Sequence, residues 1–136
     1  TGASAGAAEA GAPLRPGTTI RTDPGDGFAA LDLGGGSRVE LGPDAQLRVA
    51  DGGPPGGLRL VLSAGHLRAE IHPDVWPGGI AVVTSQAEVR ATDARFLVAA
   101  VTADATDVEA EAGTVSAVRH ADGRAVAVPA GSATVV

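Results

Sequence analysis

The chain has 136 residues, a length that fits one domain and that can bury enough surface to fold without a disulfide or a metal. Its ten basic residues are all arginine and are scattered along the chain, while sixteen acidic residues bring the formal charge to −6. This balance disfavours nucleic-acid partners and basic membrane-binding patches. Cysteine is absent and aromatic residues make up only 2%, so disulfides and thiolate metal sites are excluded and the core must be aliphatic.

The N-terminal residues 1–13 are rich in alanine and glycine and show no apolar stripe. We interpret them as a flexible arm or linker, and we assign residues 14–136 to a single β domain. The sequence starts at Thr1 without a signal segment, so we expect a piece of a longer protein with an anchor or another domain upstream. No run of eighteen apolar residues predicts a membrane span, so membrane contact is expected only through a segment outside this chain.

From residue 14 onward, apolar residues recur at every second position in short bursts that end at Gly, Pro or Asp. Such alternation places one face of each segment in a core and the other in water, which is typical of β-strands. The bursts are Leu31–Leu33, Val39–Leu41, Leu47–Val49, Leu58–Leu62, Leu67–Ile71, Ile80–Val82, Ala87–Ala91, Phe96–Val98, Val108–Ala110, Val115–Ala117, Val126–Val128 and Ala133–Val135.

The first three bursts are spaced by eight residues, and the spacing then loosens. Quasi-regular spacing indicates stacked rungs, in which each short strand pairs with the equivalent strand of the next rung. We therefore expect an all-β fold, a twisted β-solenoid-like stack of about twelve short strands. The alternative is a β-sandwich or jelly roll, which would have similar strands at less regular intervals.

The loop at residues 72–79 contains the only tryptophan, between two prolines that prevent ladder pairing. Trp76 either covers an edge of the core or forms an exposed anchor for a partner, since tryptophan is favoured at interface hot spots. The C-terminal segment is uncharged and β-prone, so its edge could pair with another chain. The candidate partner-binding residues are His72, Val75, Trp76, Val135 and Val136.

No set of residues predicts catalysis or a bound cofactor. The three histidines lack metal-ligand spacing, and no serine lies in a Gly-x-Ser-x-Gly elbow. Asp23 with Asp26, and Asp104 with Asp107, could offer oxygen atoms to calcium, but neither pair matches a calcium-binding loop and aspartate in turns usually caps backbone amides. We therefore expect a protein that is not an enzyme and that has no metal and no cofactor.

Four segments, taken in order, resemble one known family. Residues 18–33 open with an I-x-T pattern before a strand, and residues 35–49 are similar to D-G-S-x-V-x-L-x-P-x-S-x-L. Residues 62–91 contain L-x-x-G-x-L-x-x-x-I and then I-x-V-x-T-x-x-A-x-V-x-A. Residues 108–117 resemble V-x-V-x-x-G-x-V-x-V, and residues 128–131 give a closing V-P-A-G. In this order the segments resemble the FecR domain and cover nearly the whole chain.

Two positions depart from the family pattern. The family's D-G-S is Gly35-Gly36-Ser37 in this chain, and its G-T-x-F-x-V is replaced at residues 93–98, where the aromatic Phe96 is kept but Gly-Thr is lost. In better-known members, this domain is the periplasmic part of a transmembrane anti-sigma regulator. It receives a signal from a TonB-dependent outer-membrane receptor and passes it to a cytoplasmic segment that holds an iron-uptake sigma factor.

The resemblance implies a bacterial cell-envelope domain, periplasmic or extracellular, that recognises another protein in signal transduction. A structural role remains the alternative: a cell-surface or self-assembling, filament-like subunit that uses its exposed strand edges. A carbohydrate- or calcium-binding β module is the third hypothesis. It is the weakest of the three, because a surface that stacks sugars normally needs exposed aromatic residues and the chain has a single tryptophan.

Overall fold

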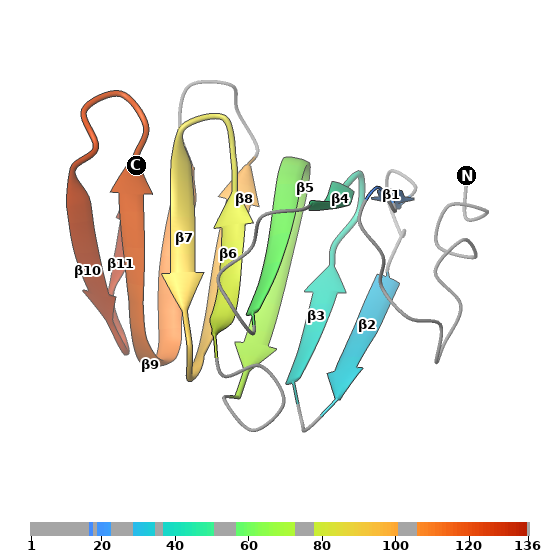
Figure 1. The fold of residues 1–136 in the computed structure, drawn as a ribbon, viewed down its shortest axis with the longest axis horizontal. Helices are drawn as coiled ribbons and strands as arrows, with labels where there is room; N and C mark the ends of the chain where they lie inside the picture. The colour runs from blue at the N-terminus through green and yellow to red at the C-terminus, as the bar shows by residue number, and fades with distance from the viewer. Residues whose placement is uncertain are drawn as a thin grey trace.

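The computed structural model, drawn in Figure 1, describes residues 17, 19–22, 29–34, 37–50, 57–72, 78–100 and 106–135, without the side chains of residues 32–34. Every regular element in these ranges is a β-strand, which confirms the all-β prediction. The eleven strands are β1 (Thr19–Arg21), β2 (Ala29–Gly34), β3 (Ser37–Leu41), β4 (Gln46–Ala50), β5 (Gly57–Ile71), β6 (Gly79–Val83), β7 (Ala87–Ala91), β8 (Ala94–Ala100), β9 (Asp107–Arg119), β10 (Ala125–Pro129) and β11 (Ala133–Val135).

The strands form two sheets that share the two longest strands, β5 and β9. Sheet A has the order β1-β4-β5-β6-β7-β9-β10, and sheet B has the order β2-β3-β5-β8-β9-β11. Because β8 bridges β5 and β9 on one side and β6 with β7 bridges them on the other, these five strands close into a small barrel. The remaining strands extend the sheets at both ends of the long axis (Figure 1).

The predicted solenoid-like stack is not confirmed. A solenoid requires equivalent strands stacked in parallel, whereas β5 with β6 is the only parallel pair between the described strands. The alternation that predicted short rungs is real, but two pairs of successive bursts lie within single continuous strands, β5 and β9. The sandwich alternative is closer, since two sheets enclose the core, but the closed ring makes a barrel.

Glycines mark the two points where a long strand passes from one sheet to the other. Residues 57–64 of β5 pair in sheet A and residues 65–71 pair in sheet B, so the change falls at Gly65. In β9 the change follows Gly113. Both have positive φ, 90° and 72°, and a Cβ at either would lie within 2.6 Å of a backbone atom of Ala45 or Asp93, the residues that directly precede β4 and β8. No other residue fits these bends without strain.

The core between the sheets is built from the alternating apolar positions of the bursts, almost entirely from aliphatic side chains and alanine. Phe96, predicted to lie in the core, is completely buried. It lies on β8, which is paired on both sides, so the ring fills the middle of the barrel. Small side chains suffice because the interior of so small a barrel is narrow.

Buried hydroxyl groups close the turns at the ends of the strands. Thr22 donates from Oγ1 to the carbonyl of Gly42 at 2.6 Å and accepts from the amide of Ala45 at 2.8 Å, which ties β1 to the turn before β4. Ser37 Oγ accepts from the amide of His72 at 2.8 Å. The I-x-T and G-S portions of the sequence therefore satisfy backbone groups that burial would otherwise leave unpaired.

A pair of buried hydroxyls supports the turn between β6 and β7. Thr84 Oγ1 lies 2.7 Å from Thr106 Oγ1, and it accepts from the amide of Ala87 at 3.1 Å. The hydroxyl of Thr106 also donates to the side-chain oxygen of Gln86 at 3.0 Å. These bonds hold the start of β9 against the β6–β7 turn.

Candidate functional site

Of the five predicted partner-binding residues, the structure describes only His72 and Val135, which lie far apart. Val75, Trp76 and Val136 lie outside the described residues, as do the arm at residues 1–13, Asp23, Asp26 and Asp104. His72 directly follows the last residue of β5. Val135 lies on β11, at the other end of the part of β5 that pairs in sheet B. The register partners Val135, Asp107, Ala99 and His66 form one row across the sheet there. The two ends are six residues apart, about 20 Å along an extended strand.

His72 contacts two carboxylates. Its Nε2 lies 2.8 Å from Glu70 Oε2, and its Nδ1 lies 3.5 Å from Asp93 Oδ1. The hydrogen bond to Glu70 raises the pKa of His72, with the charge of Glu70 and the contact to Asp93 acting in the same direction. The same hydrogen bond lowers the pKa of Glu70. About a third of each side chain is exposed, so solvent weakens the attraction between Glu70 and His72 and the pair contributes little to the stability of the fold.

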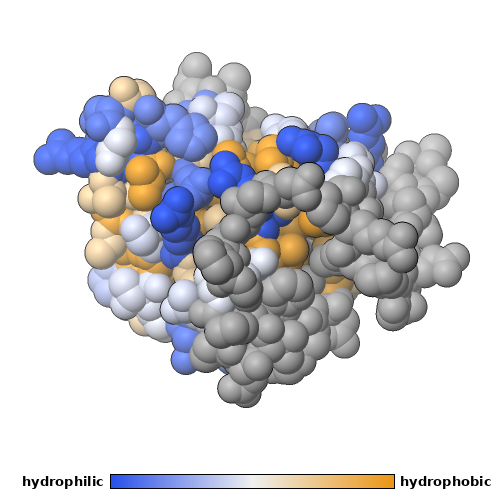
Figure 2. Space-filling view, viewed as in Figure 1, coloured by the Kyte–Doolittle hydropathy of each residue, from blue (hydrophilic) through white to orange (hydrophobic). Residues whose placement is uncertain are grey.

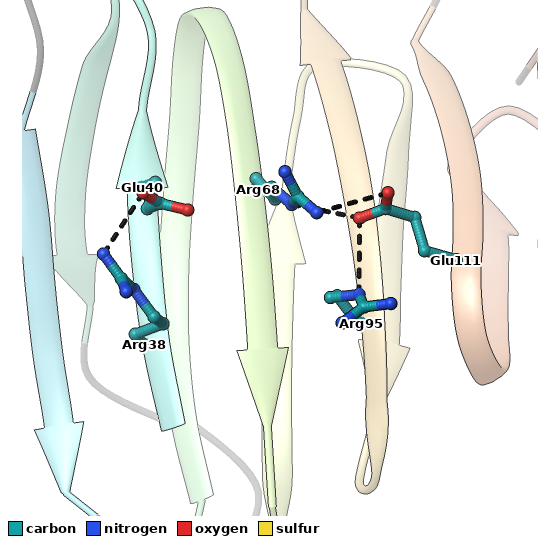
Figure 3. Close-up of polar contacts among 5 residues, drawn as sticks. All are labelled: Arg38, Glu40, Arg68, Arg95 and Glu111. Carbon is teal, nitrogen blue, oxygen red and sulfur yellow. Dashed lines mark hydrogen bonds and ion pairs between the residues drawn. The ribbon is translucent and has the colours of Figure 1, made fainter. Parts of the chain in front are cut away.

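The outward face of sheet B carries a charge network over β3, β5, β8 and β9 (Figure 3). Glu111 accepts from two arginines: its Oε1 lies 3.0 Å from Arg68 Nε and 3.6 Å from Arg95 Nε. Arg38 pairs with Glu40 at 3.2 Å on β3. Charges of opposite sign face each other across the strands, so this half of the face is balanced.

The other half of the same face is hollowed into a groove of about 680 Å³. Two rows of residues cross it in strand register: Ala99, Asp107 and Val135 in one, and Leu97, Glu109 and Ala133 in the other. Each row therefore places a carboxylate of β9 between apolar side chains of β8 and β11. We call this surface the sheet B groove. His66 on β5 lies at its far side.

The two carboxylates of the groove have no counter-charge. Within the described ranges, neither Asp107 nor Glu109 forms an ion pair or a side-chain hydrogen bond. Arg68 lies in the same register row as Glu109, on the far side of Leu97, but is paired with Glu111. The groove thus carries two uncompensated negative charges beside a balanced charge network.

The outward face of sheet A has a smaller hollow, of about 320 Å³, beside Arg90, Ser116 and Ala127 on β7, β9 and β10. Its charged side chains are paired near the middle of the sheet, where Glu88 contacts Arg59 at 3.3 Å and also contacts Arg90. Figure 2 shows hydrophobic residues interrupted by hydrophilic ones over the coloured part of the visible face, rather than one large apolar patch. No large exposed apolar surface of the kind that marks an obligate interface is visible there.

No metal or catalytic centre emerges from the described ranges. No group of three or more His, Asp or Glu residues within them is placed to hold a metal ion. Nor does the described structure contain a helix long and apolar enough to cross a membrane. Two features of the described surface that the core does not require lie side by side on sheet B: the charge network and the sheet B groove.

A comparison with family models matches the FecR protein family over residues 18–116, well over half of the chain. The chain belongs to the FecR family. The matched region of this FecR domain runs from before β1 to the second half of β9, so it includes every strand of the closed barrel except the last residues of β9. No curated protein gives a significant match.

Two solved structures share this fold. Both are crystal structures described as a putative anti-sigma factor from Parabacteroides distasonis ATCC 8503, at 18% and 20% identity, each with a TM-score of 0.72. The alignments cover 88% of this FecR domain and 54% of those chains. The chain therefore spans about half the length of these proteins. At this level of identity, the likeness supports the fold alone.

Sequence reasoning singled out Val135 and weighed Asp107 as a calcium ligand, but it did not find the groove. Leu97, Ala99, Glu109 and Ala133 are outward positions in predicted strands, and alternation alone gave them no special role. Only the register of β8, β9 and β11 brings them together. The available signal was weak: two acidic residues, Asp107 and Glu109, separated by one residue in β9.

Proposed function

We propose that this chain is a non-enzymatic, extracytoplasmic protein-binding domain that takes part in the control of a sigma factor. The observation that carries the proposal is membership of the FecR family over residues 18–116. The same fold occurs in the two solved chains described as a putative anti-sigma factor. In this role the domain lies in the periplasm or outside the cell and senses or passes on an envelope signal.

The distribution of polar groups supports binding rather than catalysis. The buried hydroxyls of Thr22, Ser37 and Thr84 are used in closing turns, and the charges of sheet B are mostly paired with each other. General acid–base or nucleophilic catalysis needs reactive groups gathered in a concave, partly apolar site. In the sheet B groove, the acidic groups are two exposed carboxylates on one strand.

The test is genetic. In the strain that carries the gene, the segment encoding residues 14–136 is deleted in frame and all transcripts are measured. We expect the targets of one sigma factor to rise or fall together, because a regulator without its sensing domain loses its signal dependence. A transcript profile identical to that of the parent strain, with the shortened protein present in the cell, would rule the proposal out.

Self-assembly is a second candidate, and the edges of the two sheets favour it. β10 and β11 are outermost strands, neither contains a charged residue, and Val126 and Val135 are 37% and 67% exposed. Uncharged edges of this kind template pairing with another chain. Light scattering over a range of concentrations tests the candidate. Growth of the particle mass with concentration supports it, and a monomer up to millimolar concentration removes it.

A further inference from the structure

The sheet B groove has a geometry that selects its ligand. Asp107 and Glu109 are two residues apart on β9, so both side chains leave the same face of the strand. Successive side chains on one face of an extended chain are about 7 Å apart. A second extended chain laid over β9 has the same repeat, so two of its side chains that are separated by one residue can reach the two carboxylates.

The apolar walls fit the stems of long basic side chains. Leu97 and Ala99 lie on one side of the carboxylates, and Ala133 and Val135 lie on the other. Arginine and lysine cover apolar surface with their methylene groups while their charged ends remain near water or a carboxylate. Both carboxylates are exposed, so a basic side chain can reach them from solvent.

Charge complementarity therefore specifies the occupant. We propose that the sheet B groove binds an extended segment of a partner protein with two basic residues separated by one residue. The inference rests on the proposed protein-binding function and deepens it by naming the surface and the chemistry of the partner. The intervening residue of the segment points away from the groove, so the structure places no demand on its identity.

The first experiment uses two blocked nonapeptides of threonine and serine that differ only in the order of residues. One has arginine at positions four and six, and the other has arginine at positions four and five. In an extended peptide, the first pair points to one side and the second pair to opposite sides. Binding to the isotopically labelled domain is followed by amide chemical shifts, which detect weak complexes.

We expect the spaced peptide to bind about fivefold more tightly, the effect of one additional exposed ion pair at the upper end of its usual range. The amides of Ala99, Ala133 and Val135 should shift, and binding should weaken as salt is raised. Equal affinities for the two peptides, no binding of either, or shifts confined to the Arg38–Glu40 region would overturn the proposal.

Matched variants test the two carboxylates. In Asp107→Asn/Glu109→Gln, the shape of the groove is kept and its charge is removed, so affinity for the spaced peptide should fall roughly tenfold. The control Asp44→Asn/Asp122→Asn removes two carboxylates on turns outside the groove and should bind as the parent does. Thermal unfolding of both variants verifies that they are folded. An equal loss of peptide affinity in the two variants would show a general effect of charge and would contradict binding in the groove.

A second copy of the chain is the competing occupant. Arg21 and Arg48 lie on neighbouring strands β1 and β4, and neither forms an ion pair within the described residues. If the groove amides shift with protein concentration alone, and Arg21→Gln/Arg48→Gln abolishes this, the groove binds another copy and the proposal fails. If the peptides fail but deletion of the domain still changes sigma-factor transcripts, this inference falls and the proposed function stands.

Discussion

At the scale of single residues, the fold depends on small side chains placed where the chain turns or changes sheet. Gly113 and Gly123 show how much the surroundings matter. Their φ angles are nearly the same, 72° and 69°, but a Cβ on Gly113 would lie 2.3 Å from the carbonyl oxygen of Asp93, whereas a Cβ on Gly123 would meet nothing within 4 Å. The first glycine is required by crowding and by φ, and the second by φ alone.

This difference gives a matched pair of substitutions. Gly123→Ala should lower the free energy of unfolding by about 1 kcal/mol, the cost of positive φ in a residue with a Cβ. Gly113→Ala should lower it by about 2–4 kcal/mol, because the displacement of β8 adds to that cost. Urea unfolding measures both. Equal losses would show that the close approach at Gly113 does not constrain the barrel.

The buried hydroxyl of Thr22 provides a second prediction. Thr22→Val keeps the shape but leaves the buried amide of Ala45 without an acceptor, so the free energy of unfolding should fall by about 1–3 kcal/mol. Thr22→Ser keeps the hydroxyl and should cost about 1 kcal/mol or less, the value of one methyl group. If Thr22→Val lowers the free energy of unfolding less than Thr22→Ser does, the hydroxyl does not support the turn before β4.

The Glu70–His72 pair predicts a dependence on pH. Because the pKa of His72 is raised, its contribution is complete below about pH 6.5 and is lost as the pH rises through the raised value. Because the pKa of Glu70 is lowered, its contribution is complete above about pH 4.5 and is lost as the pH falls through the lowered value. The pair is therefore fully formed between these limits.

A titration of the His72 ring by NMR measures this coupling. Glu70→Gln removes the hydrogen-bonded carboxylate and should move the midpoint down toward that of a free histidine. The control Glu109→Gln removes a carboxylate in the sheet B groove, which His72 does not contact, and should leave the midpoint unchanged. The same downward shift in both variants would mean that overall charge, rather than the contact, sets the pKa of His72.

At the scale of elements, β5 and β9 organise the molecule because each belongs to both sheets. Sequence alternation predicted most of the strands correctly, since period-two burial is visible in residues such as Leu58, Leu60 and Leu62. It could not show that the bursts on either side of Gly65 lie in one strand, because a glycine between two bursts also indicates a turn. The bend at Gly65 brings the strand so close to Ala45 that no Cβ fits, and Ala45 is distant in the sequence.

Native-state hydrogen exchange tests this ranking of elements. Backbone amides in the middle of β5 and β9, which have strands on both sides, should exchange most slowly, through global unfolding. Amides of β1 and β11, which are three-residue edge strands, should exchange faster through local opening. Equal protection of β11 and β5 would contradict the view that the barrel forms a stable centre with extra strands at its ends.

At the scale of the whole molecule, the barrel presents one balanced charged surface and, beside it, a groove with unbalanced charge. The resemblance of four sequence segments to the FecR domain was confirmed. The loop composition and the uncharged C-terminal segment separately predicted partner binding at the tryptophan loop and the C-terminal edge. The groove is assembled from β5, β8, β9 and β11, so it depends on register that no local pattern specifies. Of the two predicted partner-binding residues that the structure describes, Val135 lines the groove and His72 does not.

The most direct test of this account is the transcript level of the sigma-factor targets identified by deletion of the domain. It is measured in strains that carry Asp107→Asn/Glu109→Gln or Asp44→Asn/Asp122→Asn at the native gene. We expect the groove variant to change these transcripts in the same direction as the deletion and the control variant to match the parent. Parent-level transcripts in the groove variant, with the protein folded and present in normal amount, would contradict it.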